Sequence, residues 1–176
     1  ARVLGFPEFD PITAEARARR DKAMLALRGD SDAALPPGWE HFDWKRHYEY
    51  QKRLRDAGVE SSDTIGVLVR SARGDFAGAL STGGTTLTLR GRVGDVPLRG
   101  AGLYVGTDGA VACTGNGEDI VREMLARRVY DRIAGGEGAA AAVRWGVALF
   151  AESVPIGIIA LDARGDAAAS NRSMAW

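Results

Sequence analysis

The sequence contains a single cysteine, only two histidines, and no excess of charge of either sign. One cysteine, Cys113, allows neither an intrachain disulfide nor a cysteine-based zinc cluster, and this agrees with a reducing, cytoplasmic location. Lysine and arginine number 23 and aspartate and glutamate also number 23, so no strongly cationic face is expected for nucleic acid or anionic lipid. No apolar run approaches the roughly 20 residues of a membrane span. We therefore expect neither nucleic acid nor a membrane as a partner.

Several familiar sites are also disfavoured by position or spacing. His41 and His47 are six residues apart on a predicted helix, so they do not lie on one face, as two histidines at i and i+4 would. The run Gly136-Glu137-Gly138-Ala139-Ala140-Ala141 has the letters of a dinucleotide fingerprint, but it follows a predicted helix and therefore indicates a turn between helices. No glycine loop ends in the Gly-Lys-Ser/Thr that cradles phosphates. We expect no cofactor and no metal ligands.

The chain of 176 residues is 45% hydrophobic, which is enough for one compact domain. The sequence pattern changes near Thr64, from polar amphipathic segments that predict helices to segments that predict strands. Helices are predicted from about Ile12 to Arg28, capped by Asp10 or Thr13, and from Trp39 to Ala57. Later helices are predicted at Glu118 to Ile133 and Gly138 to Ala151, and strands at Thr64 to Arg70, Phe76 to Ser81, Ala101 to Val105, Ala110 to Cys113, Pro155 to Asp162 and Ala167 to Ser170. This order predicts an α+β layered sandwich, not a parallel βαβ sheet.

Four polar segments are candidates for chemistry: Asp63-Thr64, Ser81-Thr82-Gly83-Gly84, Gly91-Arg92-Val93-Gly94-Asp95 and Thr114-Gly115-Asn116-Gly117-Glu118. Each also has a purely structural interpretation. Thr64 suits the start of a strand. The second glycine-rich segment could be a turn held by an Arg92–Asp95 ion pair, and the last could be a helix N-terminus capped by Thr114 or Asn116.

Taken together, the four segments form a chemically sensible set. A threonine hydroxyl needs a base to become a nucleophile. If the Asp63–Thr64 bond is cut, the new α-amine of Thr64 has a reference pKa of about 8 and can be that base without a histidine. Arg92 offers a guanidinium for a carboxylate, and Asp95 a carboxylate for an ammonium. Thr114 and the Gly115 amide can donate to a developing oxyanion.

These segments, with Gly100-Ala101-Gly102-Leu103-Tyr104, resemble the N-terminal nucleophile hydrolases of the plant-type asparaginase, isoaspartyl peptidase and glycosylasparaginase family. The resemblance implies a four-layer αββα sandwich made as a precursor that cleaves itself between Asp63 and Thr64. Residues 1–63 would be the C-terminal part of the α subunit, and residues 64–176 the β subunit. We expect that the N-terminal part of the α subunit, with its cation-binding loop, is missing from this sequence.

The resemblance also implies a role for each motif residue. Thr64 would attack the side-chain amide of an asparagine-like substrate, and Thr82 would orient its hydroxyl or amine. Arg92 would bind the substrate α-carboxylate and Asp95 its α-ammonium. Thr114 and Gly115 would bind substrate and form the oxyanion hole. A dimer of processed αβ heterodimers is implied as the assembly.

Two departures keep other interpretations open. Val96 stands where the family usually has a serine, and the motifs conflict, because residues 63–66 resemble glycosylasparaginases whereas residues 81–84 resemble asparaginases and isoaspartyl peptidases. The main hypothesis is hydrolysis of asparagine or β-aspartyl dipeptides. Its alternatives are a glycosylasparaginase, an inactive truncated homologue that acts as a binding or assembly partner, and a small-anion or nucleotide binder.

Overall fold

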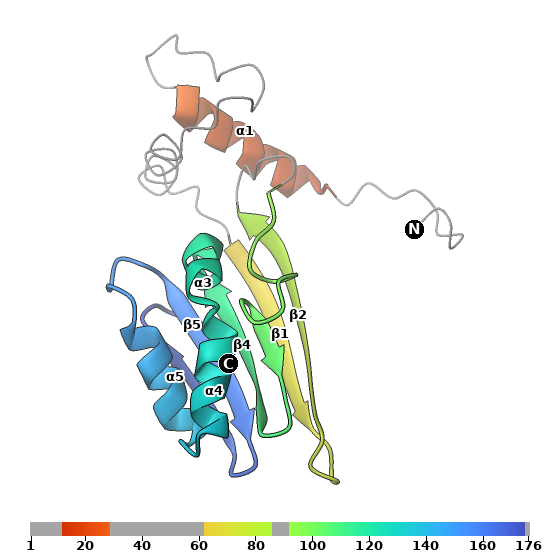
Figure 1. Cartoon of the computed structure of the whole chain (residues 1–176). Coiled ribbons are helices and arrows are strands. Elements are labelled where there is room, and N and C mark those ends of the chain that lie inside the picture. Colours follow the sequence, from red (N-terminus) through yellow and green to blue (C-terminus); the bar gives the residue numbers. More distant parts are fainter. Residues whose placement is uncertain (1–11, 29–61, 86–91, 175–176) are drawn as a thin grey trace, which may run out of the picture. The chain divides into compact units, whose positions relative to one another are not determined.

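The computed structural model describes residues 12–28, 62–85 and 92–174 (Figure 1). The chain divides into two compact units, Ala1–Ser61 with Thr85–Thr88, and Ser62–Gly84 with Leu89–Trp176. In the first unit, helix α1 spans Ala14–Arg28. The Thr13 hydroxyl accepts the Ala16 N–H at 3.1 Å, which confirms the predicted helix and Thr13 as its cap. The helix predicted at residues 39–57 lies outside the described residues.

The described residues of the second unit form two sheets and three helices. Its elements are β1 (Ser62–Arg70), β2 (Phe76–Thr85), β3 (Leu103–Val105), β4 (Gly109–Gly115), α3 (Gly117–Glu123), α4 (Leu125–Ala134), α5 (Ala139–Ala148), β5 (Ile156–Asp162) and β6 (Asp166–Ser170). Strands β1 and β2 form one sheet, and β3-β4-β5-β6 form an antiparallel sheet in that order. All six predicted strands are therefore confirmed.

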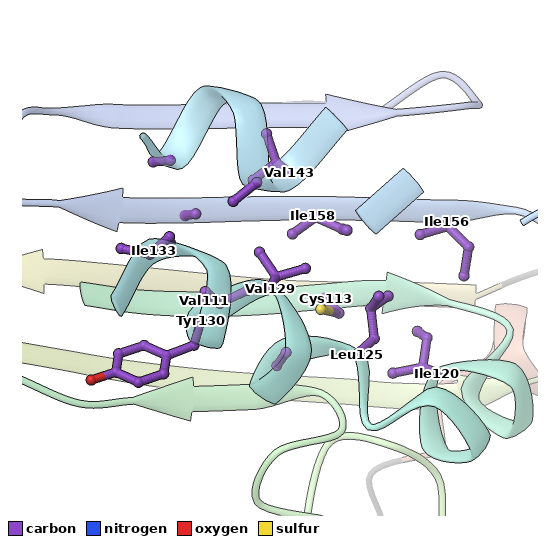
Figure 2. Close-up of a cluster of buried hydrophobic side chains, with 14 of the residues drawn as sticks. Val111, Cys113, Ile120, Leu125, Val129, Tyr130, Ile133, Val143, Ile156 and Ile158 are labelled. Carbon is purple, nitrogen blue, oxygen red and sulfur yellow. The ribbon is translucent and has the colours of Figure 1, made fainter. Parts of the chain in front are cut away.

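Side chains alternate along the strands of the four-stranded sheet, so its two faces have different neighbours. On one face, Val111 and Cys113 of β4 and Ile158 of β5 are fully buried beneath α4 and α5 (Figure 2). On the other face, a Cβ added to Gly66 of β1 would meet the Ala112 side chain at 3.7 Å, so the β1–β2 sheet packs there. The mixed α+β class is confirmed as a helix layer and two sheets. The fourth layer and the missing N-terminal part stay predictions.

The helix predicted from Glu118 to Ile133 is wrong in one respect, since it is two helices. Met124 between α3 and α4 has left-handed backbone angles, φ 48° and ψ 48°. The Ala126 and Arg127 N–H groups donate to the carbonyls of Ala101 and Gly100 at 3.0 and 2.8 Å. The carbonyl groups of Gly100 and Ala101 thus accept N–H groups of the first turn of α4. For this reason a new helix begins at Leu125 instead of a continuation of α3. The spacing of apolar residues between Glu118 and Ile133 does not reveal this contact with residues 100–101.

Candidate active site

Thr64 and Thr82 are brought together by pairing of β1 with β2. The Thr64 hydroxyl donates to the Thr82 hydroxyl at 3.2 Å. Thr64 is half-buried and Thr82 is exposed. Strand β2 was expected to end at Ser81 but continues to Thr85, and this extension places Thr82 on the strand beside Thr64. Asp63 precedes Thr64 within β1, and its side chain lies outside the described part of the structure.

A cavity of about 640 Å³ lies beside Thr64, between the two sheets. Thr64 and Gly66 of β1 line it together with Thr114 of β4 and Gly157 of β5. Thr114 is the register partner of Gly157, so both face the cavity on adjacent strands. The predicted nucleophile and one predicted oxyanion donor therefore line the same cavity, each from a different sheet.

The backbone after Thr114 is held in a conformation that favours glycine. Gly115 has φ 144°, and a Cβ there would lie 2.1 Å from the carbonyl oxygen of Pro155. The next N–H, of Asn116, donates to that same carbonyl at 3.1 Å. Since any side chain at residue 115 would collide with β5, the glycine allows the strand to close onto its neighbour beside the cavity.

Arg92 forms a two-point ion pair with Glu118. Its Nε and Nη2 atoms donate to the two Glu118 carboxylate oxygens at 2.9 and 3.0 Å. The side chains are 15% and 26% exposed. Arg92 thus forms an ion pair with Glu118, whereas the structural alternative for this segment was a turn held by an Arg92–Asp95 ion pair. The sequence had indicated Glu118 only as part of a helix N-terminus. Its charge, opposite to that of Arg92 in another motif, was the only sequence feature that pointed to this ion pair.

Asp95 lies buried beside this pair and is 7% exposed. A Cβ added to Gly102 would lie 2.8 Å from its Oδ2, and one added to Gly117 would lie 2.9 Å from its Oδ1. Burial raises the pKa of the Asp95 carboxyl, and Glu118 also raises it, whereas a backbone hydrogen bond and Arg92 oppose the rise. Within the described residues, Asp95 Oδ2 has no hydrogen-bond partner. An ammonium would supply both the missing donor and the missing charge.

The candidate site residues therefore fall into two groups, and of these residues only Thr64 and Thr114 line the cavity. The threonine cluster is Thr64, Thr82 and Thr114, and the charged cluster is Arg92, Asp95 and Glu118. A Cβ at Gly117 would lie 2.8 Å from Arg92 Nη2, so the charged cluster lies against the segment that directly follows β4. Strand β4 and this segment join the two clusters. The geometry offers a hydroxyl pair, a carboxylate for a cation and a guanidinium for an anion.

Other kinds of site find no support among residues 12–28, 62–85 and 92–174. In those ranges, no three His, Cys, Asp or Glu side chains gather so as to hold a metal ion. No helix in the same ranges is long and apolar enough to span a membrane. Cys113 is buried on the helix side of β4, where burial raises the pKa of its thiol well above the ordinary value.

The family model described as asparaginase matches residues 1–176, which is the whole chain. The chain belongs to this asparaginase family, and the resemblance seen in its motifs is confirmed. The plant-type L-asparaginase of Pyrococcus furiosus is 34% identical over 170 residues, covering 94% of this chain and 51% of that protein.

Relatives with other names are also similar over shorter stretches. The isoaspartyl peptidase/L-asparaginase of Synechocystis sp. is 40% identical over 110 residues, 61% of this chain and 33% of that protein. The N(4)-(β-N-acetylglucosaminyl)-L-asparaginase of Elizabethkingia miricola is 34% identical over 128 residues, 65% and 37% of the two chains. The chain spans about half the length of the plant-type relatives it matches.

Proposed function

We propose that the protein is an amidohydrolase that cleaves β-aspartyl amide bonds, in asparagine or in β-aspartyl dipeptides, with Thr64 as its N-terminal nucleophile. The observation that carries this proposal is the 3.2 Å contact between the Thr64 and Thr82 hydroxyls, beside a cavity that Thr64 shares with Thr114. The similar proteins named as an L-asparaginase and as an isoaspartyl peptidase/L-asparaginase support the same reaction class.

The first step in this proposal is self-cleavage before Thr64. The Thr64 hydroxyl oxygen attacks the Asp63 carbonyl carbon, the peptide C–N bond breaks, and the nitrogen takes up a proton. An ester then links Asp63 to the Thr64 side chain. Water hydrolyses that ester, which leaves a carboxylate on Asp63 and a free α-amine on Thr64. The amine then lies on the nucleophile itself and acts as its base near neutral pH.

Substrate hydrolysis would use the same hydroxyl. The Thr64 amine takes the hydroxyl proton while the oxygen attacks the β-amide carbon of the substrate. The Thr114 hydroxyl and the Gly115 N–H donate to the developing oxyanion. The Thr64 ammonium returns the proton to the leaving nitrogen, the C–N bond breaks, and a β-aspartyl ester remains. Water attacks this ester, releases aspartate and restores Thr64. Thr82 orients the hydroxyl throughout.

The charged cluster would hold the amino-acid end of the substrate. Asp95 takes the α-ammonium, which gives its buried Oδ2 a partner. Arg92 takes the α-carboxylate through Nη1, since Nε and Nη2 donate to Glu118. Glu118 is therefore a positioning residue for Arg92. A free amino acid carries both charges on one carbon, so only such an end satisfies both groups at once.

Intact mass and aspartate release test this proposal. We expect two fragments divided between Asp63 and Thr64, and hydrolysis of asparagine or a β-aspartyl dipeptide. Thr64→Ala abolishes both, whereas the control Thr107→Ala, an exposed turn threonine, changes neither. If Thr64→Ala released aspartate at the wild-type rate, Thr64 would not be the nucleophile. A single uncut mass without hydrolysis of any substrate would favour the inactive binding partner, and preference for glycosyl-asparagine would favour the glycosylasparaginase. Sedimentation would test the dimer of processed αβ pairs, which we propose from the family resemblance alone.

A further inference from the structure

Two buried side-chain atoms of the described chain lack a hydrogen-bond partner, Asp95 Oδ2 and Arg172 Nε. A buried donor or acceptor without a partner is costly, so each such atom in a folded protein needs an explanation. The proposed function explains Asp95, whose partner is the substrate ammonium. It gives Arg172 no role, although this residue lines the cavity that contains Thr64.

The backbone of Arg172 is held firmly in the wall of that cavity. Its N–H donates to the Ser170 hydroxyl at 3.0 Å, and this hydroxyl lies 2.8 Å from the Arg172 carbonyl oxygen. The intervening Asn171 side chain accepts the Ile156 N–H at 2.8 Å and donates to the Val154 carbonyl at 2.7 Å. The turn after β6 is therefore fastened to the start of β5, which fixes the backbone from which the Arg172 side chain extends.

The next residues bring this turn back over β5, close to Thr114. A Cβ added to Gly157 would lie 2.0 Å from the Met174 sulfur and 3.2 Å from the Thr114 methyl carbon. Met174 therefore packs directly on the backbone of Gly157, which is the strand partner of Thr114. Arg172 and Met174 line one cavity with Thr64 and Thr114.

The strand order places Arg172 on the opposite side of Thr114 from Asp95. Asp95 lies against Gly102, whose carbonyl accepts the Cys113 N–H, on the β3 side of β4. On the other side, Thr114 pairs with Gly157 of β5, and Gly157 pairs with Ser170 of β6. Two strand spacings of about 5 Å each separate β4 from β6. A substrate whose amino-acid end lies at Asp95 and whose amide lies at Thr114 therefore extends its leaving group toward β6.

We propose that Arg172 binds the carboxylate of the leaving amino acid in a β-aspartyl dipeptide. This inference rests on the proposed function and names its substrate class. A guanidinium with an unused, desolvated Nε–H is matched to a carboxylate. The leaving amino acid of a β-aspartyl dipeptide carries a carboxylate one carbon from the scissile nitrogen, whereas ammonia and a glycosylamine carry no anion. Arg172 thus selects isoaspartyl peptides over asparagine and glycosyl-asparagine.

The test compares a β-aspartyl-leucine dipeptide with the same dipeptide carrying a C-terminal amide. The measured quantity is the ratio of their kcat/KM values, acid over amide. We expect this ratio to fall by roughly 10- to 100-fold in Arg172→Gln, the range for losing a hydrogen bond to a charged group. Arg172→Lys keeps the positive charge, so its ratio of kcat/KM values should lie between those of the wild type and Arg172→Gln. The control Arg144→Gln, an exposed arginine of α5, should keep the wild-type ratio.

Each outcome decides between the two proposals. An equal ratio in wild type and Arg172→Gln would overturn the role of Arg172, while Thr64-dependent release of aspartate from the same substrates would leave the proposed function standing. A ratio that falls equally in Arg144→Gln would also overturn it, because the effect would then be one of general surface charge. No hydrolysis of either dipeptide or of asparagine by the wild-type protein would overturn both.

Discussion

Replacing Glu118 by glutamine should weaken substrate binding through Arg92. Glutamine offers Arg92 one acceptor in place of two and removes the negative charge, so one of the 2.9 and 3.0 Å contacts is lost. A hydrogen bond to a charged group contributes about 1.5–3 kcal/mol. The pair is 15% and 26% exposed, so solvent screening reduces this contribution to about 1–2 kcal/mol. If that energy is lost from substrate binding, KM for asparagine rises roughly 5- to 30-fold while kcat changes little.

The pH dependence of kcat/KM supplies a second readout for the same variant. The Glu118 carboxylate raises the pKa of Asp95, so removing its charge lowers the pH at which Asp95 becomes protonated. The Thr64 amine sets the upper part of the acid limb of the kcat/KM profile. The lower-pH part of that limb, where Asp95 becomes protonated, should therefore move to lower pH in Glu118→Gln. A residue that only supports the fold of α3 would not move this limb.

Glu123→Gln is the matched control on the same helix. Glu123 pairs with Arg128, and both side chains are about a third or more exposed. We expect its KM and acid limb to stay at the wild-type values. The positioning role of Glu118 would be refuted by an unchanged KM together with an unchanged acid limb, or by an equal rise of KM in Glu123→Gln.

Two further predictions concern the other buried carboxylates. Asp162, although buried, has a lowered pKa because the N–H groups of Ala139, Arg164 and Gly165 donate to its carboxylate at 2.8, 2.6 and 2.9 Å. Asp162→Asn should lower the free energy of unfolding at pH 7 by about 1–3 kcal/mol. Because the pKa of Asp162 is lower in the folded than in the unfolded protein, the stability difference between wild type and Asp162→Asn should disappear as the pH falls through the folded pKa. Urea unfolding at pH 7 and pH 3 measures this difference. An equal difference at the two pH values would refute the prediction. Asp95 has a raised pKa, so ionising it destabilises the fold as pH rises. Asp95→Asn should therefore increase the melting temperature at pH 8, by less at lower pH, while raising KM for asparagine roughly 30-fold or more; a lower melting temperature at pH 8 would contradict this.

Local sequence patterns were sufficient for most of the secondary structure. Alternation of Ile65, Val67 and Val69 with Gly66 and Leu68 predicted the strand that the structure contains as β1, because a period of two depends only on near neighbours. Thr13 was predicted as a cap from its place before an amphipathic run, and it accepts the Ala16 N–H. The motif at residues 63–64 and its companions placed the chain in the asparaginase family, whose model matches residues 1–176.

Contacts between distant segments escaped the same reasoning. The break at Met124 depends on carbonyl groups of Gly100 and Ala101, which no pattern within the helix reveals. Arg92 and Glu118 are 26 residues apart, and either could have paired elsewhere. No local motif marked Arg172, which reaches the cavity only because β6 follows β5 at the edge of the sheet.

Residue types along the chain were enough to propose the chemistry: Thr64 as a nucleophile, Arg92 and Asp95 for an amino-acid end, and a glycine-rich strand-to-helix junction. Which of these groups meet depends on the folded structure. Thr82 lies beside Thr64, Arg92 pairs with Glu118, Asp95 is buried, and Arg172 lines the cavity that Thr64 also lines. Residue types and short periods are properties of neighbours along the chain, whereas burial and pairing depend on strand order and on segments far apart in sequence.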